Sequence, residues 1–240
     1  MLFEAQQFVS ALSFSQIRTP KLFWPESMDK VTINGQTLVL SQLRSGIQDL
    51  IHDTRGLLSR LTGGRHFATK LPENFQDDLP STTRGYSWLS HGPFTDHPHA
   101  YLQFLINDSE WNIAYLDDQG EINWNIPALH EFMSLTAQVN ANLMVLNFIT
   151  ADNRGTQIVD QQITNATQPR NLYRPLQDMF WLQRRTKTSN LKGADACIPT
   201  FIPPVIVELM TQYLAGGIRE TEVIFAHVLY SPAVADQYRT

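Results

Sequence analysis

An apolar run with a polar break decides the fold of this chain: Leu143-Met-Val-Leu-Asn-Phe-Ile-Thr-Ala-Asp-Asn-Arg-Gly-Thr-Gln-Ile-Val-Asp160. Its apolar residues predict a helix that ends near Asn153, after which the chain turns and a second helix begins. Arg154 therefore lies at a helix junction. There it either caps or ion-pairs the helix, for example with Asp152 or Asp160, or it is available to hold an anion through its two-pronged guanidinium.

A β-hairpin is predicted further along the chain. One strand with a polar end is Met179-Phe-Trp-Leu-Gln-Arg-Arg-Thr-Lys187, and its return strand is Ala196-Cys-Ile-Pro-Thr200. We therefore expect Lys187 near the tip of the hairpin. A helix is expected next over Pro203-Pro-Val-Ile-Val-Glu-Leu-Met-Thr-Gln-Tyr-Leu214, with prolines in its first turn, where a missing N–H costs nothing.

This order of parts resembles the first half of a tyrosine recombinase catalytic domain of the phage-integrase type. In that family an arginine that follows an apolar helix binds the scissile phosphate, and a lysine in a β-hairpin reaches the DNA minor groove beside it. The resemblance places Arg154 and Lys187 in these two roles. It implies a partial recombinase-like catalytic domain over residues 86–240, preceded by a helical region.

The resemblance does not extend to the rest of the recombinase site. The family also carries a His-x-x-Arg box, a further His or Trp, and a nucleophilic tyrosine, which do not occur in that order here. His227 is followed by Val-Leu-Tyr rather than by an arginine three residues on. Tyr230 or Tyr238 would match the nucleophile only by accident. We therefore expect no complete catalytic site and no DNA cleavage.

Five segments carry a second resemblance, and they are Asn34-Gly35 with the helix that follows to Gly63-Gly64, Thr83-Arg-Gly-Tyr-Ser-Trp-Leu89, Asn153-Arg-Gly-Thr-Gln-Ile158, Arg184-Arg-Thr-Lys187, and Ile198-Pro-Thr-Phe-Ile-Pro-Pro-Val205 with its helix. They are similar to the region ahead of the motor in large fungal RecQ-like DNA helicases of the transposon- or telomere-associated kind. The sequence has no Gly-x4-Gly-Lys-Ser/Thr phosphate loop, so it contains no helicase motor. The resemblance implies an accessory region or gene remnant of mobile-element origin.

The remaining pattern predicts a mainly α-helical fold with small β-hairpins, of the α+β class. Asn34-Gly35 favours a tight turn, so a hairpin is expected over Val31–Leu40. Further expected elements are a helix from Ser41 to a stop at Gly63-Gly64, a helix over Pro98–Asn107, a hairpin of Trp111–Tyr115 with Ile122–Ile126, and a helix from Pro127 toward Phe148. The alternative for Trp111–Tyr115 is an extension of a helix. Residues 65–85 are polar and contain prolines, which predicts a linker between region 1–64 and domain 86–240.

Charge is unevenly distributed along the chain. The formal net charge is −5 at pH 7, which argues against a surface made for nucleic acid throughout. One stretch carries six cations against a single acid, Asp178, and these cations are Arg170, Arg174, Arg184, Arg185, Lys187 and Lys192. Between Asp96 and Glu131 there are seven acids and no lysine or arginine. The cations near Lys187 form either a solvated hairpin tip or a phosphate-binding surface, to which nearby hydroxyl and amide side chains would add donors.

The cysteine and histidines favour structural roles. Cys197 is the only cysteine, which excludes an intrachain disulfide and favours a reducing compartment. His91, His97 and His99 lie near Asp96, but prolines among them break any helix that could set ligand spacing. We therefore expect no bound metal.

Two further patterns bear on partners. The tryptophans are either stacking platforms for single-stranded nucleic acid or core residues, and their apolar neighbours favour the core for Trp88, Trp111, Trp124 and Trp181. The sequence has no run of 18 apolar residues and no positively charged start. We expect an intracellular, nuclear protein with no membrane partner.

These observations predict a non-catalytic DNA-binding module that uses no cofactor and binds duplex DNA weakly through phosphates. The expected contact residues are Arg154, Arg184, Arg185, Lys187 and Lys192. The alternative is a protein-interaction or scaffold domain in which the hairpin charge is incidental. Salt-dependent binding to duplex DNA distinguishes the two, because neutralised phosphates release counterions.

Overall fold

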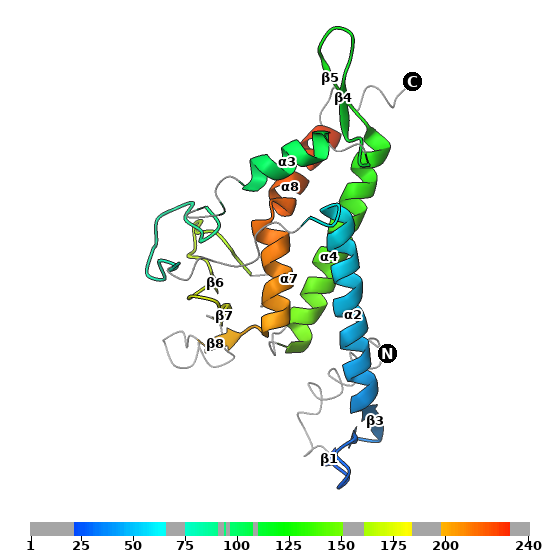
Figure 1. Ribbon diagram of the computed structural model, residues 1–240. Coiled ribbons are helices and arrows are strands. Elements are labelled where there is room, and N and C mark those ends of the chain that lie inside the picture. The colour runs from blue at the N-terminus through cyan, green and yellow to red at the C-terminus, as the bar shows by residue number, and fades with distance from the viewer. Residues whose placement is uncertain are drawn as a thin grey trace. The chain divides into compact units, whose positions relative to one another are not determined.

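The computed structural model describes residues 22–65, 75–90, 94, 97–107, 110–150, 161–183 and 198–230. Five helices make up 49% of these residues, and the strands form small antiparallel sheets (Figure 1). This confirms the expected mainly α-helical fold with small β-hairpins. The chain divides into two compact units, Met1–Asp53 and Thr54–Thr240.

The described part of the first unit is a small sheet followed by the start of a long helix. Strands β1 (Leu22–Phe23), β2 (Lys30–Ile33) and β3 (Gln36–Val39) pair in that order, and helix α2 spans Leu40–Leu61. The β2–β3 turn holds Asn34 at φ 51° and Gly35 at φ 86°, the left-handed pair that a two-residue hairpin favours. Val31 and Ile33 are buried at the centre of this sheet. The hairpin predicted from Asn34-Gly35 is therefore confirmed.

Helix α2 ends where the sequence predicts. Leu61 is its last residue, and Gly63 and Gly64 follow with φ of 57° and 72°. Gly63 is needed for a second reason, because a Cβ at this position would lie 2.9 Å from the Phe104 ring. This close approach packs the end of α2 against Phe104 of the second unit.

The division of the chain differs from the division into 1–64, 65–85 and 86–240 that the sequence suggests, because it falls within α2. The described part of the expected linker, residues 75–85, is bonded to other parts of the second unit. Its Gly85 N–H donates to the Asn165 carbonyl at 2.8 Å, and its buried Asp77 pairs with Arg170. Buried and hydrogen-bonded residues of this kind belong to a packed unit rather than to a connection.

The second unit is built around helix α4 (Ile126–Thr150). Helices α7 (Pro204–Ala215) and α8 (Ile218–Leu229) pack against α4, and α3 (His97–Asn107) packs against α8 (Figure 1). The helices expected near Pro98, Pro127 and Pro203 are thereby confirmed, with Pro204 in the first turn of α7. Helix α8 was not predicted from the sequence.

Among the described residues, α4 is the one helix whose length and composition would suffice to cross a membrane. Those two features are weak evidence for a span, because the central helix of a folded domain shares them. Phe132, Val139 and Leu146 of α4 are fully buried within the second unit. Helix α4 therefore has the packing of a central helix in this structure.

Two small sheets complete the described part of the second unit. Strands β4 (Ala114–Leu116) and β5 (Ile122–Trp124) form the hairpin predicted around Gly120, whose φ is 80°. Strands β6 (Leu172–Tyr173), β7 (Phe180–Gln183) and β8 (Ile198–Phe201) form an antiparallel sheet in that order. The β7–β8 pair confirms the second predicted hairpin, whereas β6 was not predicted.

Helix α8 begins without a side-chain cap and carries a partly buried carboxyl in its first turn. Its N-cap residue is Gly217, at φ 82°, and Glu220 lies in the first turn. Burial raises the pKa of Glu220, because the charged form is desolvated. Among the described residues, no group donates a hydrogen bond to its Oε2 atom. Folding therefore favours the protonated carboxyl.

The stability contributed by protonated Glu220 is expected to be complete below the unfolded-state pKa and to be lost as pH rises through the raised folded-state pKa. Glu220→Gln keeps the shape and removes the charge, so it should increase stability near neutral pH. It should also flatten the dependence of stability on pH above the ordinary glutamate pKa, where the parent carboxyl loses its proton. Urea denaturation at a series of pH values measures both effects. An unchanged pH profile in this variant would contradict the assignment.

Candidate functional site

The β6–β7–β8 sheet positions the basic segment that the sequence singles out. Strands β7 and β8 are antiparallel, and Gln183 is opposite Ile198 at the end of their register. The segment 184–197 therefore leaves the sheet and returns to it at the same end. It contains one acid, Asp195, and four cations, which are Arg184, Arg185, Lys187 and Lys192.

The expected phosphate-contacting residues themselves lie outside the described residues. This holds for Arg154 as well as for Arg184, Arg185, Lys187 and Lys192. The structure describes the residues on either side of them. These are Thr150, the last residue of α4, and Gln161 for Arg154, and Gln183 of β7 and Ile198 of β8 for the other four cations.

Two arginines of the basic stretch are buried. Arg170 is 0% exposed and Arg174 is 2% exposed. The sequence suggested a basic run from 170 to 192, and this burial corrects it, because neither guanidinium is at the surface to meet a phosphate. The other four cations of this stretch belong to segment 184–197.

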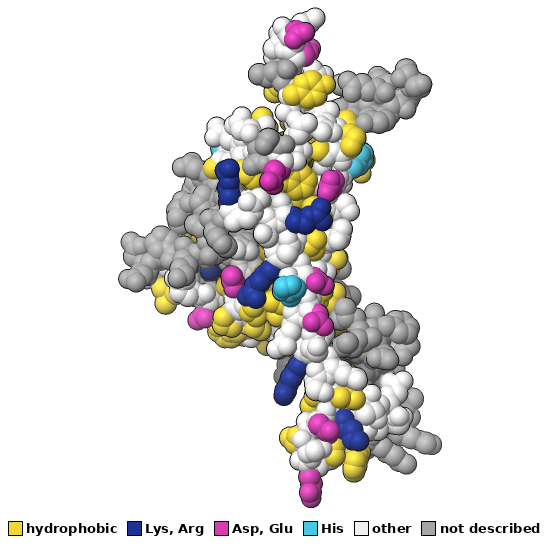
Figure 2. All heavy atoms as spheres, turned by 45° about the vertical axis from the view of Figure 1, so that its right-hand side comes forward, with side chains coloured by type: hydrophobic (Ala, Val, Ile, Leu, Met, Phe, Trp, Pro, Cys, Tyr) yellow, Lys and Arg dark blue, Asp and Glu magenta, His cyan; other side chains and the backbone are white. Residues whose placement is uncertain are grey.

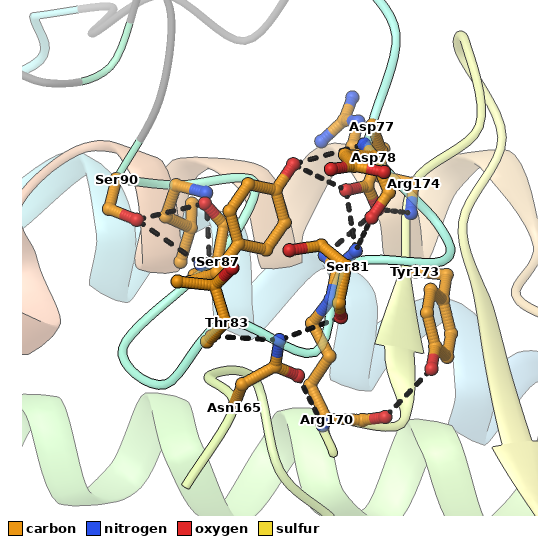
Figure 3. Close-up of polar contacts among 12 residues, drawn as sticks. Asp77, Asp78, Ser81, Thr83, Ser87, Ser90, Asn165, Arg170, Tyr173 and Arg174 are labelled. Carbon is orange, nitrogen blue, oxygen red and sulfur yellow. Dashed lines mark hydrogen bonds and ion pairs between the residues drawn. The ribbon is translucent and has the colours of Figure 1, made fainter.

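Arg170 forms a bidentate ion pair with Asp77 (Figure 3). Its Nη1 donates to Asp77 Oδ2 at 3.0 Å, and its Nη2 is 2.7 Å from Asp77 Oδ1, with both side chains fully buried. The guanidinium also lies over the rings of Tyr86 and Tyr173, with its carbon 4.7 and 4.8 Å from their centroids. The two-pronged geometry and the aromatic faces compensate for the loss of water around both charges.

The Asp77 carboxylate joins segment 75–90 to the chain around β6 in the second unit. Besides Arg170, it accepts a hydrogen bond from the backbone N–H of Arg174 at 3.0 Å and from the Tyr86 hydroxyl at 3.2 Å (Figure 3). Arg174 directly follows β6, so this contact fixes the end of that strand. The pair therefore anchors segment 75–90 to the β6–β7–β8 sheet.

Asn165 provides a second link between the same two segments. Its side-chain amide donates to the carbonyls of Ser81 and Thr83 at 2.8 and 3.1 Å, and its carbonyl oxygen accepts from Arg170 N–H at 2.8 Å (Figure 3). Its backbone exchanges hydrogen bonds with Gly85 and Tyr86. One buried asparagine thus bonds several backbone groups of segment 75–90 and also the backbone N–H of the fully buried Arg170.

Arg174 is held by different groups. Its Nη1 donates to the Thr211 hydroxyl of α7, which in turn donates to the Val207 carbonyl, and its guanidinium lies 5.1 Å from the Trp88 ring centroid. Burial lowers the pKa of Arg174 to about 10, so the group remains charged at neutral pH. The contact joins β6 to α7, the helix that follows the basic hairpin.

The other described charges do not form a second basic surface on the face shown in Figure 2. Lysine and arginine side chains there are interspersed with acidic ones. Two of the arginines form interhelical ion pairs, Arg55 with Glu208 at 3.2 Å and Arg60 with Glu131 at 2.8 Å. Paired, exposed charges of this kind have little left to offer a phosphate.

The remaining candidate residues from the sequence have mixed outcomes. Trp88 and Trp181 are buried, which confirms the core assignment for both, and Trp111 and Trp124 are half-buried against Phe132 and Phe225. Tyr230 is 85% exposed at the end of α8, whereas Tyr238, His91 and Cys197 lie outside the described residues. The described residues contain no group of three or more His, Cys, Asp or Glu that could hold a metal ion.

Comparison of the chain with protein-family models, with curated proteins and with solved structures gives no match in any of the three.

Proposed function

We propose that this chain is a non-catalytic DNA-binding module whose phosphate contacts are made by segment 184–197, the connection between β7 and β8. The observation that carries the proposal is the pairing of Gln183 with Ile198, which puts both ends of a segment with four cations and one acid at one end of a sheet. Lysine and arginine side chains on a short connection can reach phosphates without sequence preference. Weak, phosphate-directed binding to duplex DNA is the activity that this arrangement supports.

The anchoring of the sheet that carries segment 184–197 supports the proposal further. Strand β6 is anchored through the buried Asp77–Arg170 pair, and β7 through Trp181, which is 3% exposed and donates to Asn147 of α4 at 3.3 Å. Binding residues are commonly carried on connections that a rigid scaffold positions. A cation-rich connection on a sheet whose strands β6 and β7 are both anchored fits that pattern.

The proposal also concerns the evolutionary origin of the chain. The order of α4, Arg154, the β7–β8 hairpin with Lys187 in its connection, and α7 with a proline in its first turn is the order that resembles the first half of a tyrosine recombinase catalytic domain. A recombinase-like or helicase-associated region of mobile-element origin, without the cleaving residues, accounts for this order. The proposed module therefore positions DNA and does not cut it.

Replacing Arg184, Arg185, Lys187 and Lys192 together by alanine is expected to weaken duplex binding by roughly tenfold or more at low salt. Each neutralised phosphate contributes roughly 0.9 to the slope of log K against log salt, so the slope should flatten by up to about 3–4 units. Fluorescence anisotropy with a labelled duplex at several salt concentrations measures both. The helical circular dichroism should stay unchanged, because solvated charges contribute little to stability.

A variant with the same change in net charge provides the matched control. Lys30, Arg44, Arg84 and Arg219 are exposed cations outside segment 184–197, and their joint replacement by alanine should leave most of the binding intact. Equal losses in the two variants would mean that total charge rather than the segment governs binding. A parent chain that fails to bind duplex DNA even at low salt would exclude the proposal altogether.

The lineage has its own test in a double-mutant cycle. The resemblance places Lys187 in the minor groove beside the phosphate that Arg154 binds, so the losses of DNA affinity in Arg154→Ala and Lys187→Ala should not add in the double variant. Additive losses would place the two residues at separate points on the DNA and contradict the recombinase-like arrangement. The same proteins should form no covalent adduct with DNA after denaturation.

A protein-interaction domain is the alternative, and exposed apolar side chains favour it. Tyr115 and Ile122 are 57% and 56% exposed on the two strands of the β4–β5 hairpin. Tyr115 pairs with Asn123, the neighbour of Ile122, so the two exposed side chains belong to opposite faces of the hairpin. Exposed apolar side chains on a short hairpin can mark protein contacts. Loss of DNA binding in the parent, together with capture of a protein partner that depends on Tyr115 and Ile122, would favour this second function.

A further inference from the structure

The second unit contains a groove between α4, α7 and α8 that the proposed DNA contacts do not use. It holds about 400 Å³, which lies within the range of small-molecule sites. On α4 it extends from Met133 to Asn147, a length of roughly 21 Å at the rise of an α-helix. The groove is therefore long relative to its volume.

The walls of the groove are mainly apolar. Met133 and Met144 of α4, Met210 and Leu214 of α7 and Val223 of α8 line it. Methionine side chains are flexible and polarisable, so they adapt to apolar molecules of different shape. A mostly apolar ligand body is the chemistry that these walls match.

Most polar groups in the groove are already satisfied. Asn147 accepts from the Trp181 indole N–H at 3.3 Å and donates to the Leu143 carbonyl at 3.0 Å. The Tyr213 hydroxyl donates to Glu222 Oε2 at 2.8 Å, and burial raises the pKa of Tyr213, so it remains a donor. These groups leave little hydrogen-bonding capacity for a ligand.

Gln161 differs from these residues. It lines the groove, and its side-chain nitrogen Nε2 is buried. Among the described residues, no atom accepts a hydrogen bond from that nitrogen. A buried donor without an acceptor costs free energy, and a ligand oxygen would remove that cost.

The charges that line the groove balance. Arg219 and Glu222 lie three positions apart on α8, on the same side of the helix, and both line the groove. A net charge on the ligand would be attracted by one of them and repelled by the other. The groove therefore favours an uncharged ligand.

We infer that this groove binds a small, uncharged, largely apolar molecule that presents a carbonyl-type oxygen to Gln161. The apolar walls hold the body of the molecule, and the amide nitrogen fixes its orientation. None of the groove-lining residues belongs to segment 184–197, so the inference adds ligand binding to the proposed DNA contacts and does not depend on them.

Two uncharged dyes of similar size test the inference. 6-Propionyl-2-dimethylaminonaphthalene carries a ketone oxygen, whereas N-phenyl-1-naphthylamine is apolar and has no carbonyl. Titration of the full chain, followed by the blue shift of dye fluorescence, should give saturable binding of both at one site. In Gln161→Leu the ketone dye should bind about threefold to tenfold more weakly, the worth of one hydrogen bond, while the dye without a carbonyl should bind as before.

Adjacent residues on α8 supply a matched pair of variants. Val223→Trp fills the groove from a side chain that is 54% exposed, and it should weaken both dyes by roughly tenfold or more. Ile224, 40% exposed, is not among the groove-lining residues, so Ile224→Trp should change neither affinity. Absence of saturable binding, equal effects of the two tryptophan variants, or equal weakening of both dyes in Gln161→Leu would overturn the inference.

Discussion

Replacing Arg170 by methionine is expected to lower the free energy of unfolding by about 3–5 kcal/mol. The variant removes the guanidinium that lies 2.7 Å from Asp77 Oδ1 and leaves a fully buried carboxylate without its cation. Asp77→Asn should have an effect of similar size, because it leaves Arg170 charged and buried. Urea denaturation followed by circular dichroism measures both changes.

The exposed ion pair between Arg60 and Glu131 is the control for this prediction. Its donor and acceptor lie 2.8 Å apart, but the two side chains are 60% and 57% exposed, so Arg60→Met should cost less than about 1 kcal/mol. The double variant Arg170→Met with Asp77→Asn should lose less than the sum of the single losses, because no buried charge remains unpaired. Additive losses, or single losses as small as in Arg60→Met, would contradict the structural role of the pair.

The expected loss also bears on the proposed function. Asp77 fixes the end of β6 through the Arg174 N–H, and β6 pairs with β7, which leads into segment 184–197. An Arg170→Met protein should therefore lose DNA binding together with its folded structure, whereas the alanine variant of the four segment cations should lose binding and keep its fold. The two kinds of variant separate a positioning role from direct contact.

Elements marked by local signals could be predicted from the sequence. Asn34-Gly35 adopts the left-handed backbone that its turn favours, Gly63 and Gly64 follow the end of α2, and Pro204 occupies the first turn of α7. Each of these depends on the backbone preference of one or two residues, so neighbours in the sequence are enough to reveal it.

Other elements lack such signals. Helix α8 begins at Gly217 without a side-chain cap, so no Ser, Thr, Asp or Asn marks its start. Strand β6 has two residues, too few for an alternating pattern. Both are held in place by tertiary contacts, α8 by its packing on α4 and β6 by its pairing with β7.

The contacts that hold the sheet of the candidate site in place join residues far apart in the sequence. Asp77 and Arg170 are 93 positions apart, and nothing near Asp77 distinguishes it from the other acids of the polar segment 65–85. A carboxylate beside prolines predicts a solvated connection unless a buried arginine meets it. By contrast, the β7–β8 hairpin that carries Lys187 could be predicted, because its strands are consecutive and its connection is polar.

The aromatic core of the second unit should be as sensitive as the buried ion pair. Phe132 of α4 is fully buried, with the rings of Phe225, Trp111 and Tyr101 centred 5.0, 5.7 and 6.4 Å away. Phe132→Ala removes a ring from the point where α4 packs on α8, and it should cost about 3–5 kcal/mol of unfolding free energy. Loss of helical circular dichroism in urea measures the change.

Phe201 supplies the matched control for the aromatic core, since it is the same residue type in the same unit but is 61% exposed on β8. Its ring lies 5.6 Å from that of Phe180 between centroids and is largely open to solvent, so Phe201→Ala should cost less than about 1 kcal/mol. Phe132→Leu should fall between the two, because leucine fills part of the space and creates a smaller cavity. If Phe132→Ala were as stable as Phe201→Ala, α4 would not be the central helix of the unit, and the packing of α8 against it would have to be wrong.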